Sequence, residues 1–581
     1  MKFLLKYLIC FPLRKSTKNK SKKQKLSKKI NTSFGYLGIF LFLFLIAPSK
    51  AFADTFTVTN TNDSGTGSLR DAVAQAEANP GADTIVFDGS LAGQTITLTS
   101  KDSNIQTLRN KSCSSFSGNY DPYGALQITE SLTIDGSSAP GITISGNWNG
   151  TDKSNQGNRV FYIPSPNNRP NGSSSAAVTL NLNDITLDKG NAGPLNGGGD
   201  FDNPCSNGGN IYFDSNGGEL NLTRVNIKGG HANDGGGLNV ERGDLNIFNS
   251  TLSDNLTRDD GGAIDFSGGG TATLVNSTLA KNTAGFGSAG SPTNRGGAIR
   301  LDGRMNMTYV TVAHNFAKGE GGFIENNGTL NIRNSLIVNN DSDAEGNNSH
   351  CRINVAINDL GGNWESVNNA GDAPDCPGFN TDTEANIKLS LNLANNGGLT
   401  QTLSLDPTSS VNAVIPTSDN LCPEGVGVGD QRYFFRAVGA GCEPGAYELA
   451  QAGQTRTISG QIYEDTNRNG TFDNGTDTPL ADGVLVKLYQ ASDPNTVVAE
   501  TLTTGGNGSY SFPGVPDGDY RVEVDETDTD IPSNLTITNN PQDITLAGND
   551  ATGVDFGFSQ PVANIADVLL VKRITKINGQ T

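Results

Sequence analysis

The most regular feature of the chain is a short alternation of apolar and polar residues that recurs through its middle. It occupies residues 180–187, 220–227, 245–252, 272–279, 305–312 and 330–337. Apolar residues at every second position are typical of β-strands with one buried face. A Gly-Gly-x-Ile/Leu pattern recurs with it, beginning at residues 208, 235, 261, 296 and 321. A repeat of about 25 residues containing several short strands is too short for a propeller blade and predicts an all-β fold, the right-handed parallel β-helix.

Asparagines recur at fixed places in this repeat. One set is Asn255, Asn282, Asn315 and Asn340, and a second is Asn249, Asn276 and Asn334. Strands of neighbouring coils lie about 4.8 Å apart, so each set is predicted to stack. Stacked amides at that spacing can form a hydrogen-bonded ladder. The Gly-Gly pairs would supply turns in which a Cβ is not tolerated.

A third column of the repeat carries charge. The outward position after each Gly-Gly pair reads Tyr212, Asn239, Asp265, Arg300 and Glu325. Because the last three alternate in sign, we expect an ion ladder across the coils.

Weaker strand patterns extend the repeat towards the N-terminus. They cover residues 84–87, 95–98, 126–128, 132–134, 142–144 and 161–163. Ser68–Asp71 resembles a capping box that opens a short helix, with Ala72, Val73 and Ala76 on one face, and Asn79-Pro80-Gly81 ends it. An open solenoid end must be covered, so we predict that this helix is the N-terminal cap.

The first 53 residues differ from the rest in charge. They hold 12 of the 41 Lys and Arg residues and no acid, then an apolar run from Tyr36 to Ala47 and the small-residue pattern Ala51-Phe52-Ala53. This order is typical of a signal peptide, and we expect cleavage after Ala53. An uncleaved N-terminal anchor is the alternative. No later segment has the length of a transmembrane helix, so we expect an exported protein without one after cleavage.

Composition and net charge limit the folds and partners that the chain can have. Gly supplies 72 of 581 residues, which excludes a helical bundle. Residues 54–581 carry 29 basic and 60 acidic residues, a net charge of −31. Such a surface repels nucleic-acid phosphates and favours divalent cations.

Six cysteines remain once Cys10 leaves with the signal peptide. They are Cys113, Cys205, Cys351, Cys376, Cys422 and Cys442. An even number in an exported protein favours disulfides, and six cysteines allow 15 connectivities. Pairing of nearest neighbours (113–205, 351–376 and 422–442) is our hypothesis.

Two groups of motifs flank the repeats. Residues 67–73 (GSLRDAV) and 79–85 (NPGADTI) resemble the N-terminal region of exported bacterial β-helix proteins with a CSLREA-type motif, whose Cys is replaced by Gly67. Residues 395–403 (NNGGLTQTL), 430–432 (DQR) and 442–448 (CEPGAYE) resemble the choice-of-anchor C-terminal segment of the same proteins. The resemblance implies an exported or surface protein and no known activity.

A separate domain follows residue 454. Seven short alternating stretches within about 100 residues predict an immunoglobulin-like β-sandwich. It resembles the Ca²⁺-binding B-type repeat of Sdr surface proteins. Its loop places Asp465, Asn467, Asn469, Thr471 and Asp473 at positions 1, 3, 5, 7 and 9 of a calcium-loop pattern, with Gly470 at position 6. Thr476 stands at position 12, and Asp477 is the candidate substitute. The alternative is a turn without metal.

Catalysis on the β-helix has to be weighed. The residues before the Gly-Gly pairs include Asp234, Asp260, Arg295 and Glu320, with Asp259 adjacent, and could bind or cleave a sugar. We favour solvated turn residues. Arg300 and Arg304 could serve a polysaccharide lyase, but the sequence places no cluster of Asp in register with them. The polygalacturonase motifs are absent, and His231, His314 and His350 stand outside any catalytic motif.

These observations favour a secreted or cell-surface, non-catalytic β-helix scaffold that adheres to matrix, polysaccharide or cell-surface components. A carbohydrate-active lyase or hydrolase on the same coils is the alternative. The predicted organisation is a signal peptide at 1–53, an N-terminal cap with the first coils at 54–110, a parallel β-helix at 111–345, a C-terminal β-helix or choice-of-anchor segment at 346–450, a B-type sandwich at 455–559 and a tail at 560–581.

Overall fold

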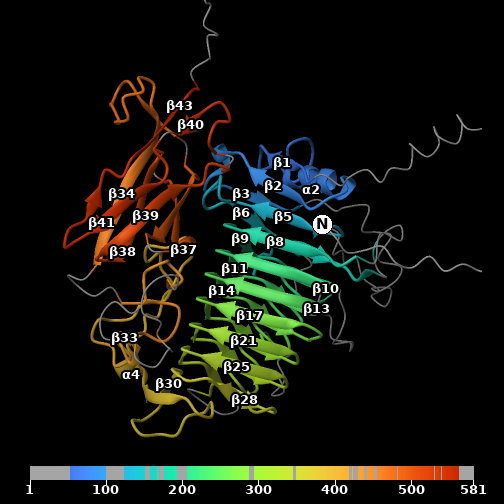
Figure 1. The fold of residues 1–581 in the computed structure, drawn as a ribbon. Helices are drawn as coiled ribbons and strands as arrows, with labels where there is room; N and C mark the ends of the chain where they lie inside the picture. The colour runs from blue at the N-terminus through green and yellow to red at the C-terminus, as the bar shows by residue number, and fades with distance from the viewer. Residues whose placement is uncertain are drawn as a thin grey trace, which may run out of the picture. The chain divides into compact units, whose positions relative to one another are not determined.

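Three stacks of parallel strands make up the larger part of the fold (Figure 1). The computed structural model describes residues 53–99, 124–150, 157–166, 169, 176–192, 206–286, 294–343, 349–417, 422, 429–436, 441–449, 455–480, 482–491, 493–504, 506–528, 530–537 and 539–561. The predicted signal peptide (apart from Ala53), the predicted 113–205 disulfide and nearly all of the tail lie outside these ranges.

The first stack is a 16-stranded sheet in which every pairing is parallel. Its strands are β1 (Thr55–Val58), β2 (Asp83–Phe87), β4 (Leu126–Gln127), β5 (Leu132–Asp135), β7 (Phe161–Ile163), β8 (Thr179–Asn183), β10 (Ile211–Thr223), β13 (Leu238–Phe248), β16 (Ile264–Phe266), β17 (Thr271–Val275), β20 (Ile299–Leu301), β21 (Arg304–Thr308), β24 (Ile324–Asn326), β25 (Thr329–Arg333), β28 (Cys351–Ile353) and β29 (Asn358–Asp359).

Two further parallel stacks complete each coil. The 10-stranded stack consists of β3 (Thr95–Thr97), β6 (Thr143–Ser145), β9 (Thr186–Asp188), β11 (Asn226–Lys228), β14 (Thr251–Ser253), β18 (Thr278–Ala280), β22 (Thr311–Ala313), β26 (Leu336–Val338), β30 (Trp364–Val367) and β31 (Asn380–Thr383). The five-stranded stack consists of β12 (His231–Ala232), β15 (Leu256–Thr257), β19 (Thr283–Ala284), β23 (Phe316–Ala317) and β27 (Asp341–Ser342). The predicted all-β parallel β-helix is confirmed.

The alternating stretches bury their apolar positions as expected. In β17 and β21, Ala272, Leu274, Met305 and Met307 are all buried, and their neighbours are partly exposed. One continuous hydrophobic cluster runs through the coils from Val58 to Phe379. Side chains of period two therefore form a core that each coil completes only together with its neighbours.

The Gly-Gly turns are tight for two separate reasons. Gly261 has φ +66°, a conformation that L-residues rarely adopt. Gly262 approaches the next coil so closely that an added Cβ would lie 2.1 Å from the carbonyl oxygen of Gly297. The prediction that these turns exclude a Cβ is confirmed.

The first asparagine ladder is confirmed. Nδ2 of Asn255 donates to Oδ1 of Asn282 at 2.9 Å, Asn282 donates to Asn315 at 2.9 Å, and Asn315 donates to Asn340 at 2.8 Å. All four side chains are buried. The ladder therefore lies inside the coil wall and satisfies polar groups that have no access to water.

The second asparagine set shares a position but does not form a ladder in the predicted way. Asn249, Asn276 and Asn334 have φ between 47° and 51°, the left-handed conformation of a turn. Asn276 donates its amide to the carbonyl oxygen of Gly429 at 2.8 Å and accepts from Arg436 at 3.0 Å. The prediction is wrong for Asn276 because a distant segment, rather than the next coil, binds its amide.

The N-terminal helix forms as predicted. Helix α2 (Leu69–Ala78) begins after Ser68, whose side chain accepts from the backbone N–H of Asp71 at 3.2 Å. Its face of Leu69, Ala72, Val73 and Ala76 is buried in the same core as β1 and β2, beside which it lies in Figure 1. The short 3₁₀ helix η1 (Gly89–Leu91) follows β2.

Parallel stacking ends with β31, and the next segment returns along the outside of the 10-stranded stack. It contains α4 (Glu384–Ile387) and the antiparallel pair β32 (Ile415–Pro416) and β33 (Gly441–Cys442). Gln431 donates to Oγ1 of Thr251 at 2.8 Å and accepts from Oγ1 of Thr278 at 2.6 Å. Outward threonines of successive coils thus bind this segment.

The C-terminal domain consists of two sheets with one shared core. The six-stranded sheet contains β34 (Thr455–Glu464), β35 (Thr478–Pro479), β38 (Ser509–Pro516), β40 (Thr536–Ile537), β42 (Ala551–Thr552) and β43 (Phe556–Ser559). The four-stranded sheet contains β36 (Leu485–Gln490), β37 (Asp493–Leu502), β39 (Gly518–Val524) and β41 (Gln542–Leu546). Ile462, Leu488 and Val522 meet between the sheets, and the predicted small β domain is confirmed.

Candidate functional site

The outward column of the first stack carries charged side chains on successive coils. Backbone pairing places Asn239 opposite Asp265, Asp265 opposite Arg300, and Arg300 opposite Glu325. Asn239 donates to Asp265 at 2.8 Å, and Arg300 lies 3.9 Å from the same carboxylate. Of the predicted ion ladder of Asp265, Arg300 and Glu325, the pair of Asp265 and Arg300 is present, whereas Glu325 pairs with Arg295 at 3.2 Å.

The acidic residues that precede the Gly-Gly pairs lie next to this column. Carboxylate oxygens of Asp234, Asp259 and Asp260 lie within 4.8 Å of one another. Oδ1 of Asp234 accepts from the backbone N–H of Asp260 at 3.1 Å, and Oδ1 of Asp260 accepts from that of Arg295 at 2.7 Å. Asp234 is 2% exposed, so the expectation of solvated turn residues is wrong for it. Asp234 packs its carboxylate against the turn of the next coil rather than into water.

Burial changes the protonation of these acids. Burial, together with the charge of the neighbouring Asp259, raises the pKa of Asp260 to about 8. Burial raises the pKa of Asp265 to about 7, although the Arg300 guanidinium opposes the shift. Burial and the charges of Asp265 and Asp259 also raise the pKa of Asp234. Part of this acidic group therefore holds protons near neutral pH.

Arg300 lies among acids, contrary to the expectation that no Asp cluster shares its register. Its guanidinium is 3.1 Å from Asp302, 3.8 Å from Asp260 and 3.9 Å from Asp265. The turn folds back over the strand that follows it, which sequence spacing alone does not reveal. The three carboxylates that lie close enough together to hold a divalent cation are those of Asp234, Asp259 and Asp260, and Arg300 already supplies positive charge beside Asp260.

The predicted calcium loop forms a compact turn between β34 and β35. Asp465 accepts from the backbone N–H of Gly470 at 2.8 Å, and Asp477 accepts from that of Thr466 at 2.9 Å. Asn467 and Asn469 donate their amides to the same oxygen of Asp473, at 2.7 and 2.6 Å. The hydroxyl of Thr471 donates to Asn469 at 2.9 Å. All six predicted ligands thus belong to one hydrogen-bonded loop.

The donor set of this loop suits calcium in its chemistry. Every side chain in it offers oxygen, the ligand that Ca²⁺ prefers. Asp465 and Asp477 are each 6% exposed, so two carboxylates are turned inward. Burial raises the pKa of Tyr463 to about 12, and the charges of Asp465 and the other nearby acids add to the shift. A cation would relieve this local excess of negative charge.

Two of the three histidines, His231 and His350, are buried, and His314 is partly exposed. The ring of His231 stacks on Trp148 at 4.3 Å between centroids and 1° between planes, and burial lowers its pKa to about 3. His314 contacts the carbonyl oxygen of Ser390 at 3.3 Å. His350 lies at the end of the asparagine ladder, where Nδ1 is 3.4 Å from Nδ2 of Asn340 and burial lowers the pKa to about 4.

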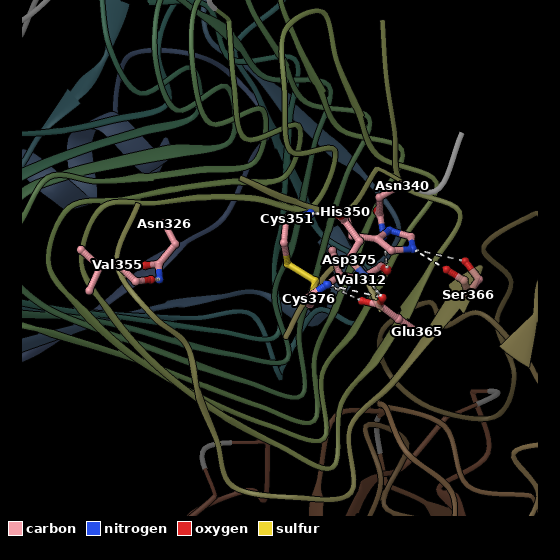
Figure 2. Close-up of a disulfide and its surroundings, with 10 residues drawn as sticks. All are labelled: Val312, Asn326, Asn340, His350, Cys351, Val355, Glu365, Ser366, Asp375 and Cys376. Atoms are coloured by element: carbon pink, nitrogen blue, oxygen red, sulfur yellow. Dashed lines mark hydrogen bonds between the residues drawn. A yellow bond between two sulfur atoms is a disulfide. The ribbon is translucent and has the colours of Figure 1, made fainter. Parts of the chain in front are cut away.

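Two of the three hypothesised disulfides are present: Cys351–Cys376 and Cys422–Cys442. The first lies in the last coils beside His350 and Glu365 (Figure 2). Oε2 of Glu365 accepts from the backbone N–H of Cys376 at 3.0 Å, and burial raises the pKa of this carboxyl to about 8. Sequence reasoning missed Glu365, because its position in the strand repeat is one that elsewhere faces the interior as an aliphatic residue.

Comparison with known proteins identifies one part of the chain. Residues 456–559 match the family model of the SdrD B-like domain. Over 123 residues the chain is 31% identical to serine-aspartate repeat-containing protein D of Staphylococcus aureus strain Newman, which covers 19% of this chain and 9% of that protein. It is 27% identical over 122 residues to protein F of Staphylococcus epidermidis strain ATCC 12228, covering 19% and 7%. The chain spans less than a tenth of the length of these relatives.

Solved structures match parts of the chain at low sequence identity. The minor pilin GBS52 of Streptococcus agalactiae matches at 18% identity over 19% of this chain and 46% of its own, with a TM-score of 0.14. Pectate lyase Pel9A matches at 12% identity over 69% of this chain and 98% of its own, with a TM-score of 0.32. None of the helices in the described ranges has the length and apolar character needed to span a bilayer.

Proposed function

We propose that this protein is an exported, cell-surface scaffold that uses its β-helix to bind extracellular polysaccharide or other surface components without chemically changing them. The observation that carries the proposal is the B-like domain at residues 456–559, a module type of Sdr surface proteins, on the same chain as a long solenoid. The resemblance of residues 67–85 and 395–448 to exported β-helix proteins supports export.

The charges of the coils support binding over catalysis. Three arginines on the coils each lie within 4 Å of an acid on a neighbouring coil, namely Arg295, Arg300 and Arg352. The positive and negative charges of these residues therefore compensate one another. His231 and His350 are buried in contacts within the coils. A ligand would bind to the regularly spaced polar side chains of the coils, and no reactive group of the protein would take part.

Calcium in the loop of residues 465–477 is part of the proposal. Asp465, Asn467, Asn469, Thr471, Asp473 and Asp477 would hold the ion, which fixes the loop between β34 and β35. The bound ion supplies positive charge to a carboxylate-rich turn and thereby rigidifies the domain.

Cell fractionation and a glycan-binding screen test this function together. We expect the protein in the surface or secreted fraction and saturable binding to one class of glycan by the purified chain. Recovery in the cytoplasm would contradict the proposal, as would failure to bind any glycan or cell-surface preparation.

A carbohydrate-active enzyme is the second candidate, favoured by one specific observation. Asp260, whose pKa burial raises to about 8, lies 3.8 Å from Arg300. A carboxyl that keeps its proton near neutral pH suits a general acid. Sugar turnover that Asp260→Asn abolishes would favour this candidate.

A further inference from the structure

The start of the described fold is organised around one buried carboxylate. Asp83, the first residue of β2, is 1% exposed. Its Oδ1 accepts from the backbone nitrogen of Asp54 at 2.8 Å and from Nδ2 of Asn79 at 2.9 Å. Its Oδ2 is buried and has no hydrogen-bond partner among the residues that the structure describes. A buried carboxylate with one unsatisfied oxygen is costly unless a further donor or a cation reaches it.

Asp54 is held firmly in place beside this carboxylate. Its carbonyl oxygen accepts from the backbone N–H of Thr84 at 2.9 Å, and the next residue, Thr55, pairs with Thr84 in the parallel β1–β2 ladder. The backbone nitrogen of Asp54 therefore points at Asp83 because the sheet begins there. Residues 53 and 54 are exposed, so the peptide bond between them lies at the surface.

This nitrogen is also the atom that signal-peptide removal would free. Ala51-Phe52-Ala53 precedes it, the small-residue pattern after which we expect cleavage. Hydrolysis of the Ala53–Asp54 peptide bond by a signal peptidase adds water across that bond. The carboxylate stays on Ala53, and the nitrogen of Asp54 becomes an amine that takes up a proton, since an unperturbed α-amino group has a pKa of about 7.7–8.0.

We propose that Asp83 is the receptor for the α-ammonium group of Asp54 created by this cleavage. The inference rests on the proposed export. The single N–H of the amide becomes three N–H donors, of which one keeps the bond to Oδ1 and another serves Oδ2. In the amide contact only the carboxylate is charged, whereas an ammonium donor is charged as well, which makes the hydrogen bond stronger than the one it replaces. Processing thus completes the first strand pair of the β-helix.

The test compares two chain starts that differ only at this nitrogen. One protein comprises residues 54–581 and begins with Asp54, and the other comprises residues 52–581 and begins with Phe52. Both span the described fold. Each is prepared as wild type, as Asp83→Asn, and as Asp88→Asn, a matched exposed carboxylate that accepts from the backbone N–H of Ser90 at 3.0 Å. Hydrogen exchange at pH 7 is followed by mass spectrometry in peptides covering β1 and β2.

We expect amide exchange in β1 and β2 to be on the order of tenfold slower in the chain that begins with Asp54. Asp83→Asn should abolish this difference between the two starts, and Asp88→Asn should leave it intact. Equal exchange in both wild-type chains would overturn the proposal, as would a difference that survives Asp83→Asn. The intact mass of the exported protein gives a second check, because an N-terminus other than Asp54 also overturns it. These outcomes do not depend on glycan binding, so they are separate from the test of the proposed function.

Discussion

Nδ2 of Asn282 donates to Oδ1 of Asn315 at 2.9 Å. The two asparagines occupy equivalent positions in successive coils. The side chain of Asn282 also accepts from Nδ2 of Asn255 and donates to the carbonyl oxygen of Leu252. An amide inside the ladder therefore forms hydrogen bonds with the asparagine on either side of it and with a backbone carbonyl. The ladder lies in the coil wall, where no water can replace a lost bond, so its members stabilise the stack as a group.

Replacing one ladder residue should be costly. Asn282→Leu removes the acceptor of the backbone N–H of Asn255, one of the two acceptors of its side-chain amide, and the donor to the carbonyl of Leu252, at about 1–3 kcal/mol for each buried group left unsatisfied. Asn216→Leu, on an exposed position of β10, should change the free energy of unfolding little. Urea denaturation of both variants measures the difference. Equal losses at the two positions would contradict the structural role of the ladder.

The contrast between the two asparagine sets shows what periodicity can and cannot predict. Asn282 and Asn315 follow strands at a constant offset, and stacking alone brings them together. Asn276 repeats just as regularly, but its left-handed backbone turns the amide towards Gly429 and Arg436, more than 150 residues later in the chain. A local repeat contains no information about such a partner.

The same limit applies to the charged site. The register of Asp265 and Arg300 follows from the repeat and was predictable. The burial of Asp234 and the approach of Asp260 to Arg300 depend on how each turn folds back over its strand. That fold-back is set by the conformations of the Gly-Gly pairs, which spacing identifies as turns without giving their direction.

The second glycine of a turn tests the packing between coils directly. Gly262→Ala places a Cβ 2.1 Å from the carbonyl oxygen of Gly297, and the coils must separate to admit it. We expect a loss of about 1–3 kcal/mol in the free energy of unfolding, typical of overpacking. Gly89→Ala is the matched control, since its Cβ would come no closer than 3.4 Å to the carbonyl oxygen of Ser138. A neutral Gly262→Ala would contradict the close approach.

Acid should destabilise the last coils through His350. Burial lowers its folded pKa to about 4, below the unfolded value near 6.5, so the unfolded state binds more protons between these pH values. The stability that neutral His350 provides is full above pH 6.5 and falls by up to about 1.4 kcal/mol per pH unit as the pH drops towards 4. His350→Gln should remove this part of the slope in denaturation curves measured from pH 7 to 4. An identical slope in variant and wild type would contradict the assignment.

Calcium should raise the melting temperature of the C-terminal domain. An ion that binds only the folded state adds about 2.7 kcal/mol at a hundredfold excess over Kd. Extracellular modules often bind at about 10⁻⁴–10⁻³ M, so millimolar calcium is needed. Asp465→Ala should erase the difference between calcium and chelator, and Asp519→Ala, an exposed acid of the same domain, should preserve it. Calorimetry that detects no shift in roughly 10 mM calcium would mean that the loop binds no ion.

Incubation of the purified protein with acidic polysaccharides tests the scaffold function most directly. Residues 54–581 carry a net charge of −31, which opposes polyanionic substrates, and the arginines beside the acidic turns are already paired. The account predicts no release of reducing ends or unsaturated uronates from pectin or alginate. Release that Asp260→Asn abolishes and Glu320→Gln preserves would contradict the account and identify an enzyme.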